Sequence, residues 1–153
     1  MGLFSFNKDS GEKNTGLSDQ EKGKFMEEII KRYNLPIEGL KVQVDGSKAS
    51  LWGIVDELGT KEKIIVSVGN IQGISEVEDF ISLRDAGEGK VHDGEIDHDK
   101  RFYTVQKGDS LSKISKTVYG DPMKYTTIFE ANKPMLKDPN LIYPGQVLRI
   151  PEL

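Results

Sequence analysis

An acidic, glycine-bearing stretch at residues 85–100 constrains the fold of this chain more than any other feature. It holds six acidic residues, two lysines and three glycines, which leaves almost nothing to bury. Such a composition predicts a solvated linker. The residues on either side then form separate small cores, which suits a chain of 153 residues with 36% hydrophobic content. We predict two small domains in tandem.

The part before the linker predicts the element order αββαβ. Ser18 and Glu21 match a capping box ahead of apolar residues at helical spacing. Residues 45–48 read as a hairpin turn, and Gly69 as the end of a second helix. The expected elements are a helix over 18–34, strands over 40–44 and 49–55, a helix over 60–68 and a strand region over 74–83.

The part after the linker predicts the order βααβ. A short strand covers 102–105, and Asp109 or Ser110 caps the helix that follows. Pro122 marks the start of a second helix, and a turn at Pro144 leads into a final strand over 146–150. The fold class is therefore α+β.

The C-terminal part resembles a LysM domain almost residue for residue. The runs that carry the resemblance are YTVQKGDSLSKIS at 103–115, IFEAN at 128–132 and IYPGQVLRIP at 142–151. Gly108 allows the tight turn into the capped helix, and Asn132 is well placed to bond loop backbone. LysM domains usually bind N-acetylglucosamine polymers, although a fold alone does not transfer that function.

The N-terminal part resembles a BON domain, through the αββαβ order and the runs VDGSKASLWG at 44–53 and VGNIQGISEV at 68–77. The whole chain resembles the small cytoplasmic bacterial potassium-binding proteins that join BON to LysM. This wider resemblance includes MGLFSF at 1–6, GEK at 11–13 and FEANKPMLK at 129–137. It divides the chain into an N-terminal segment that contributes to the ion site (1–17), a BON domain (18–84), an acidic linker (85–100) and a LysM domain (101–153).

The resemblance implies a K⁺ site built from main-chain carbonyls, with Rb⁺ or Cs⁺ as possible substitutes and Na⁺ excluded. Carbonyl dipoles can replace the water shell of K⁺, whereas carboxylate cages favour Ca²⁺ and Mg²⁺. The stretches over 7–12 and 68–74 both contain glycine, which allows backbone angles that turn several carbonyls inward. Carried over by position, the donors are the carbonyls of Asn7, Ser10, Glu12, Gly69, Ile71 and Ile74.

Composition and the N-terminus limit the partners and the location. The net charge of −4 disfavours nucleic acid, and the absence of cysteine excludes disulfides and thiolate metal sites. No stretch approaches the roughly 20 apolar residues of a membrane helix, and the N-terminus does not read as a secretory signal. We therefore expect a cytoplasmic monomer. The short Leu3, Phe4 and Phe6 cluster is expected to pack against its own domain rather than to lie on a membrane.

Other candidate sites are weak. The acids from Asp93 to Asp99 begin like a calcium loop, but His98 stands where its glycine belongs, so a solvated linker is favoured. His92 and His98 lack a third ligand at metal spacing. Trp52 is expected to be a packed strand residue or a contact between modules. No catalytic motif is present, so we expect no enzymatic activity.

These observations lead to a hypothesis and an alternative. We expect a K⁺-binding sensor in which the ion orders residues 1–16 and draws the LysM domain against the BON domain. The alternative is an envelope protein whose LysM domain binds peptidoglycan. An enzyme tethered by LysM is a third, weaker reading.

Overall fold

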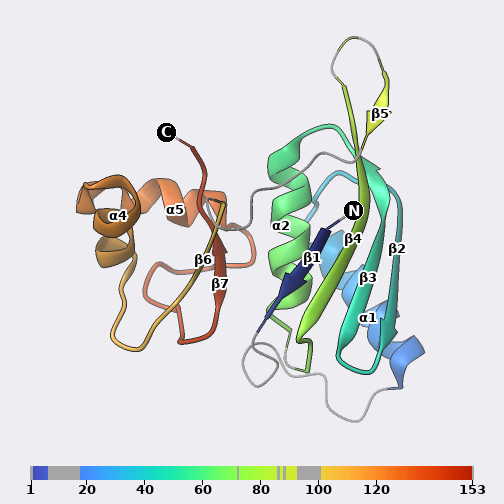
Figure 1. Ribbon diagram of the computed structural model, residues 1–153, viewed down its shortest axis with the longest axis horizontal. Helices are drawn as coiled ribbons and strands as arrows, with labels where there is room; N and C mark the ends of the chain where they lie inside the picture. Colours follow the sequence, from blue (N-terminus) through green and yellow to red (C-terminus); the bar gives the residue numbers. More distant parts are fainter. Residues whose placement is uncertain are drawn as a thin grey trace.

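The computed structural model describes residues 2–6, 18–71, 73–85, 87, 89–92 and 101–152, and it has an α+β fold (Figure 1). We call the described residues up to 92 the N-terminal half and residues 101–152 the C-terminal half. The N-terminal half contains β1 (Gly2–Ser5), α1 (Asp19–Arg32), β2 (Glu38–Asp45), β3 (Lys48–Val55), α2 (Leu58–Gly69), β4 (Glu76–Arg84) and β5 (Val91–His92). The C-terminal half contains β6 (Phe102–Thr104), α4 (Leu111–Tyr119), the 3₁₀ turn η1 (Pro122–Lys124), α5 (Tyr125–Ala131) and β7 (Val147–Arg149).

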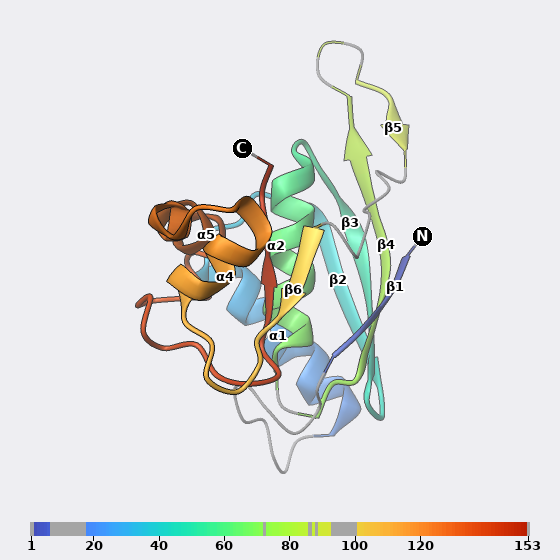
Figure 2. The same cartoon turned by 60° about the vertical axis from the view of Figure 1, so that its left-hand side comes forward.

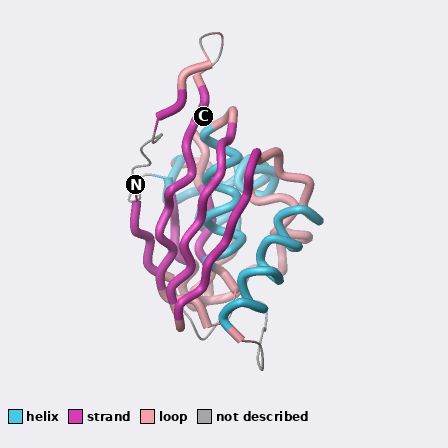
Figure 3. Tube along the Cα trace, turned by 90° about the vertical axis from the view of Figure 1, so that its right-hand side faces the viewer, coloured by secondary structure: helices cyan, strands magenta, loops and turns pink. Residues whose placement is uncertain are grey.

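The first five strands form one sheet with the order β1-β4-β3-β2, and β5 pairs with the far end of β4. Strands β2 and β3 form an antiparallel hairpin, whereas β3 and β4 run parallel and are joined through α2. Helices α1 and α2 pack on the same face of this sheet. In the described part of the chain no helix covers the opposite face (Figure 3). On that face Trp52 of β3 stacks against Phe80 of β4, with ring centroids 5.2 Å apart.

The expected αββαβ elements are confirmed, and the start of α1 shows why. The Glu21 amide donates to Ser18 Oγ at 3.2 Å, and the Ser18 amide donates to Glu21 Oε1 at 3.2 Å, which completes the predicted capping box. In the N-terminal cluster, Phe4 is buried and Phe6 packs against the core as expected, whereas Leu3 is 61% exposed. This packing involves a strand, because β1 pairs antiparallel with β4 and buries Phe4.

The first part of the expected linker is a hairpin. Val91 and His92 pair with the end of β4, and the Asp85 amide donates to the Lys90 carbonyl at 2.6 Å. Gly87 and Gly89 both adopt positive φ, which closes the turn without strain. The acidic series from Asp93 to Asp99, with His98, lies outside the described residues.

Helix α2 is the central element of the molecule. It lies between the sheet and the C-terminal half, and the C-terminal helices stand on its far side (Figures 1 and 2). For that reason it is buried on nearly all sides, polar residues included. Its buried residues are Thr60, Lys61, Glu62, Ile64, Ile65, Val66, Ser67, Val68 and Gly69.

The two halves were expected to have separate cores, and these cores touch. The larger cluster contains Phe102 and Val147 from the C-terminal half, and Phe4 meets Phe102 edge to face at 5.4 Å. The smaller cluster belongs to the C-terminal half alone and includes Ile114 and Ile128. Met135 packs against both clusters. The two halves are therefore joined by apolar contact on the C-terminal side of α2.

The C-terminal half has the predicted βααβ order. Ser110 is the cap of α4, since the Lys113 amide donates to its Oγ at 3.2 Å. Asp109, the other candidate, instead accepts from the Gln106 amide and from the Tyr103 hydroxyl, each at 2.8 Å. The Asp109 carboxylate thus closes the turn before α4, and the Ser110 hydroxyl caps the helix itself.

Candidate functional site

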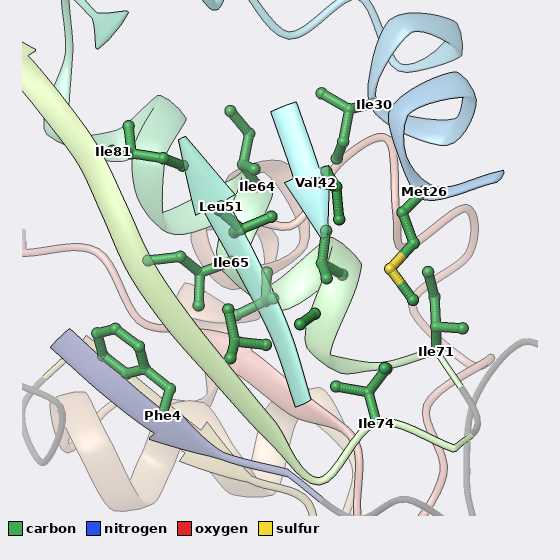
Figure 4. Close-up of a cluster of buried hydrophobic side chains, with 14 of the residues drawn as sticks. Phe4, Met26, Ile30, Val42, Leu51, Ile64, Ile65, Ile71, Ile74 and Ile81 are labelled. Carbon is green, nitrogen blue, oxygen red and sulfur yellow. The ribbon is translucent and has the colours of Figure 1, made fainter. Parts of the chain in front are cut away.

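The loop that follows α2 is the first component of the candidate site. The Ile71 amide donates to the Val68 carbonyl at 3.2 Å, and the Ile74 amide donates to the Ile71 carbonyl at 3.2 Å. Gly73 has φ +98°, which an L side chain rarely adopts. The side chains of Ile71 and Ile74 are buried in the same cluster as Met26 (Figure 4). This burial anchors the loop through its side chains.

The N-terminal segment comes down onto this loop. The Phe6 amide donates to the Ser75 carbonyl at 2.8 Å. The Phe6 ring lies over Gly69 so closely that a Cβ there would stand 2.1 Å from a ring atom. Gly69 is the last residue of α2 and has no positive φ, so glycine is needed here for the close approach of the ring rather than to end the helix.

The β2–β3 turn ties down the other end of the loop. The Ser75 amide donates to the Ser47 carbonyl at 2.8 Å, and their hydroxyls are 2.9 Å apart. Three segments that are distant in sequence therefore converge: the end of β1, the loop over 69–75 and the hairpin turn.

The electrostatics at this point suit a cation. The C-terminal end of a helix carries a partial negative charge, and α2 has no basic residue in its last turn. Among the described residues, no loop or turn amide donates to the carbonyl of Gly69 or Ile74, and the Ile71 carbonyl accepts from the Ile74 amide. The described residues also contain no group of three His, Cys, Asp or Glu that could hold a metal ion. The described part of the loop offers peptide carbonyls, the donor type that suits K⁺.

The predicted donors divide into two groups. Gly69, Ile71 and Ile74 share one loop, as the sequence indicated. Asn7, Ser10 and Glu12 lie outside the described residues. The six-carbonyl set therefore remains a prediction.

A buried ion-pair cluster on α2 also joins the halves, and it was not predicted from the sequence. Glu62 on α2 is fully buried and accepts from Arg101 Nε at 2.6 Å, Arg101 Nη2 at 2.9 Å and Arg149 Nε at 2.9 Å. The hydrogen bond that Arg101 donates to Glu62 raises the pKa of Arg101. The partners are 39 and 87 residues away along the chain, so no local pattern could have indicated them.

The C-terminal half matches the family model of the LysM domain over residues 103–151. Over nearly its whole length the chain is also similar to "Potassium binding protein Kbp" of Escherichia coli O6:H1. The two are 44% identical over an alignment of 158 positions, which covers 99% of each protein. The chain belongs to the Kbp family. The resemblance drawn from the sequence is confirmed by this match.

A second relative is an uncharacterized protein of Deinococcus radiodurans. It is 41% identical over 123 residues, which cover 77% of this chain and 45% of that protein. It is therefore similar over only part of its own length. No helix in the described ranges is long and apolar enough to cross a bilayer.

Proposed function

We propose that this member of the Kbp family binds K⁺ through main-chain carbonyls where the N-terminal segment meets the loop over 69–75. The observation that carries the proposal is the seating of Phe6 on Gly69, which brings the start of the chain to the C-terminal end of α2. The relative named for potassium binding, similar from end to end, supports the same ligand.

The proposed ligands are carbonyls from both segments. The loop supplies those of Gly69, Ile71 and Ile74, and the N-terminal segment supplies those of Asn7, Ser10 and Glu12. Peptide dipoles can replace the hydration shell of a large, weakly hydrated ion, so Rb⁺ and Cs⁺ should substitute and Na⁺ should bind poorly. The negative end of the α2 dipole favours any cation at this position.

The rest of the proposal concerns the whole molecule. We divide the chain into the ion-binding segment 1–17, a BON domain over 18–84, an acidic connection over 85–100 and a LysM domain over 101–153. The protein acts as a cytoplasmic, monomeric sensor and catalyses no reaction.

The sensing step rests on α2. The C-terminal end of this helix faces the proposed ion site, and Glu62 on the same helix bonds both arginines of the C-terminal half. An ion that binds the docked arrangement better than the undocked one shifts the population toward docking. We therefore expect K⁺ to compact the protein.

Calorimetric titration of ion-stripped protein with KCl, beside NaCl, tests the proposal. We expect a saturable heat with KCl and little with NaCl. KCl at about 100 times its dissociation constant should raise the free energy of unfolding by about 2.7 kcal/mol, because the ion binds the folded state. Equal responses to the two salts would refute the K⁺ site.

Two variants separate the carbonyl site from a carboxylate site. Deletion of residues 1–12 should abolish the heat of K⁺ binding, whereas Glu12→Gln should retain it within about threefold, since a backbone carbonyl survives the substitution. Thermal unfolding without K⁺ checks that both variants fold. A truncated protein with normal K⁺ affinity would contradict the assignment, as would a complete loss in Glu12→Gln.

A second function follows from the LysM match over 103–151. We propose that this domain can hold a glycan of the N-acetylglucosamine type, the ligand class implied by its resemblance. A pull-down on purified peptidoglycan tests this directly. Strong retention that does not depend on K⁺ would favour the glycan function, and no retention would exclude it.

A further inference from the structure

Strand β7 pairs with β6 along one edge, and two asparagine side chains hydrogen-bond to its other edge. Asn70 Nδ2 donates to the Val147 carbonyl at 2.8 Å, and the Val147 amide donates to Asn70 Oδ1 at 2.9 Å. Asn132 holds Arg149 in the same two-bond manner, at 2.9 and 2.8 Å. Since β6 pairs along the other side of β7, these amides act as substitutes for a missing neighbouring strand.

The two asparagines come from different halves of the chain. Asn132 belongs to the C-terminal half and was expected to bond loop backbone, but its side chain bonds Arg149 of the strand and the Ile128 carbonyl of α5. Asn70 is 77 residues from Val147 and belongs to the loop of the candidate ion site. Its side chain is buried, with only 7% of its surface exposed. Both amide groups are therefore satisfied inside the protein, where losing either bond is costly.

The backbone of Asn70 controls the direction of a proposed ion ligand. The Asn70 amide donates to the Val66 carbonyl at 3.1 Å, back along α2. The same planar peptide group carries the Gly69 carbonyl on its opposite side. That carbonyl must then point away from the helix, off its C-terminal end. Anchoring Asn70 by its side chain thus also fixes the orientation of the Gly69 oxygen.

We propose that Asn70 is a positioning residue, whose two hydrogen bonds to Val147 hold the ion-binding loop in place. These bonds thereby link K⁺ binding to the docking of the LysM domain. The inference rests on the K⁺ site proposed above. Linkage is reciprocal. If docking of the LysM domain raises the K⁺ affinity by orienting the carbonyl, then bound K⁺ must favour the docked state, with its Asn70–Val147 bonds, by the same factor.

A purely structural role makes a different prediction. The Glu62 cluster also joins the halves, but its hydrogen bonds run from Glu62 to Arg101 and Arg149 and involve no described residue of the loop over 69–75. If Asn70 served only to hold the halves together, then Asn70→Ala and Glu62→Gln would affect ion binding alike. If Asn70 orients the carbonyl, then only its loss should change the preference among ions of different size, because that preference depends on the positions of the oxygens.

Titration of the full chain with KCl and RbCl provides the test. We expect Asn70→Ala to lower the K⁺ affinity about tenfold or more and to change the ratio of K⁺ to Rb⁺ affinity. Glu62→Gln should weaken both ions in proportion and leave the ratio unchanged. Equal changes in both variants, or an unchanged ratio in Asn70→Ala, would overturn the inference.

Hydrogen exchange in the unsubstituted protein supplies an independent measurement, which also decides the matter if Asn70→Ala does not fold. We expect K⁺ to slow the exchange of the Val147 amide. A protein that binds K⁺ with no change at Val147 would refute the role of Asn70 while leaving the ion site intact. A protein that shows no K⁺ heat at all would refute the proposed function itself.

Discussion

Lys61→Met is expected to lower the free energy of unfolding by about 3–5 kcal/mol, because it leaves a buried carboxylate without its ion-pair partner. Lys61 Nζ lies 2.9 Å from Asp79 Oδ2, and the two residues are only 1% and 2% exposed. The pair connects α2 to β4 near the start of β1, where Gly2 pairs with Asp79. The Ile81 amide donates to Asp79 Oδ1 at 2.8 Å, and the variant should keep this hydrogen bond.

The decrease in the free energy of unfolding of Lys61→Met should become smaller as the pH falls. Burial raises the pKa of Asp79, while the hydrogen bond and charge of Lys61 lower it. Methionine removes both lowering effects, so the pKa of Asp79 in the folded variant rises further. The folded variant then binds a proton at a pH where the unfolded chain does not, and its stability increases as the pH falls through that pKa. The deficit relative to the unsubstituted protein should shrink accordingly.

Denaturant unfolding at neutral and at mildly acidic pH measures both effects. Lys48→Met is the matched control, since its 2.7 Å pair with Glu78 is partly exposed and should contribute only about 0–1 kcal/mol. The double variant Lys61→Met/Asp79→Leu should recover most of the stability, because apolar groups can replace a buried pair. A deficit for Lys61→Met no larger than that of the control, or one that is independent of pH, would contradict this account.

Gly69→Ala is expected to lower K⁺ affinity by roughly 10–100-fold, which corresponds to an overpacking cost of about 1–3 kcal/mol. The new Cβ would stand 2.1–2.3 Å from three atoms of the Phe6 ring. The ring must then move, and with it the end of β1, from which the proposed ligands of the N-terminal segment follow. Alanine also favours helix over glycine by about 1 kcal/mol, so the affinity should fall more than the stability of the K⁺-free protein.

Calorimetry on three variants checks this explanation. Gly59→Ala is a control in the same helix, where the Cβ would meet only the end of the Arg149 side chain, at 2.9 Å from Nη2. It should change the K⁺ affinity by no more than about threefold. In Phe6→Ala/Gly69→Ala the clash is gone, and the affinity should exceed that of Gly69→Ala alone. If Gly69→Ala binds K⁺ as well as the unsubstituted protein, then contact between Phe6 and the loop does not shape the site.

Local chemistry accounts for the elements that sequence predicted. The capping box at Ser18, the turn at residues 45–48 and the order of the C-terminal half all depend on groups a few residues apart, so their patterns are visible in the chain itself. Strand β1 was foreseen only as a packed cluster, because four residues show no distinguishing periodicity. The hairpin that ends in β5 was missed because its composition is that of a linker.

The candidate site was only partly predictable for the same reason. The loop of Gly69, Ile71 and Ile74 came from a resemblance in sequence, and its glycines and buried isoleucines agree with a shaped loop. The predictions from sequence assigned no role to Asn70 or to Glu62. Their partners, Val147 and the two arginines, belong to the other half of the chain.

The amino-acid sequence by itself determined the fold class, the order of the main elements from α1 to β4 and in the C-terminal half, and membership of the Kbp family, because these follow from short-range patterns and from similarity along the chain. Only the tertiary structure decided that α2 is buried on both sides, that Phe6 requires glycine at position 69, and that Asn70 grips Val147. Those contacts join residues brought together by packing alone. Their geometry depends on where whole elements come to rest, and no local pattern records it.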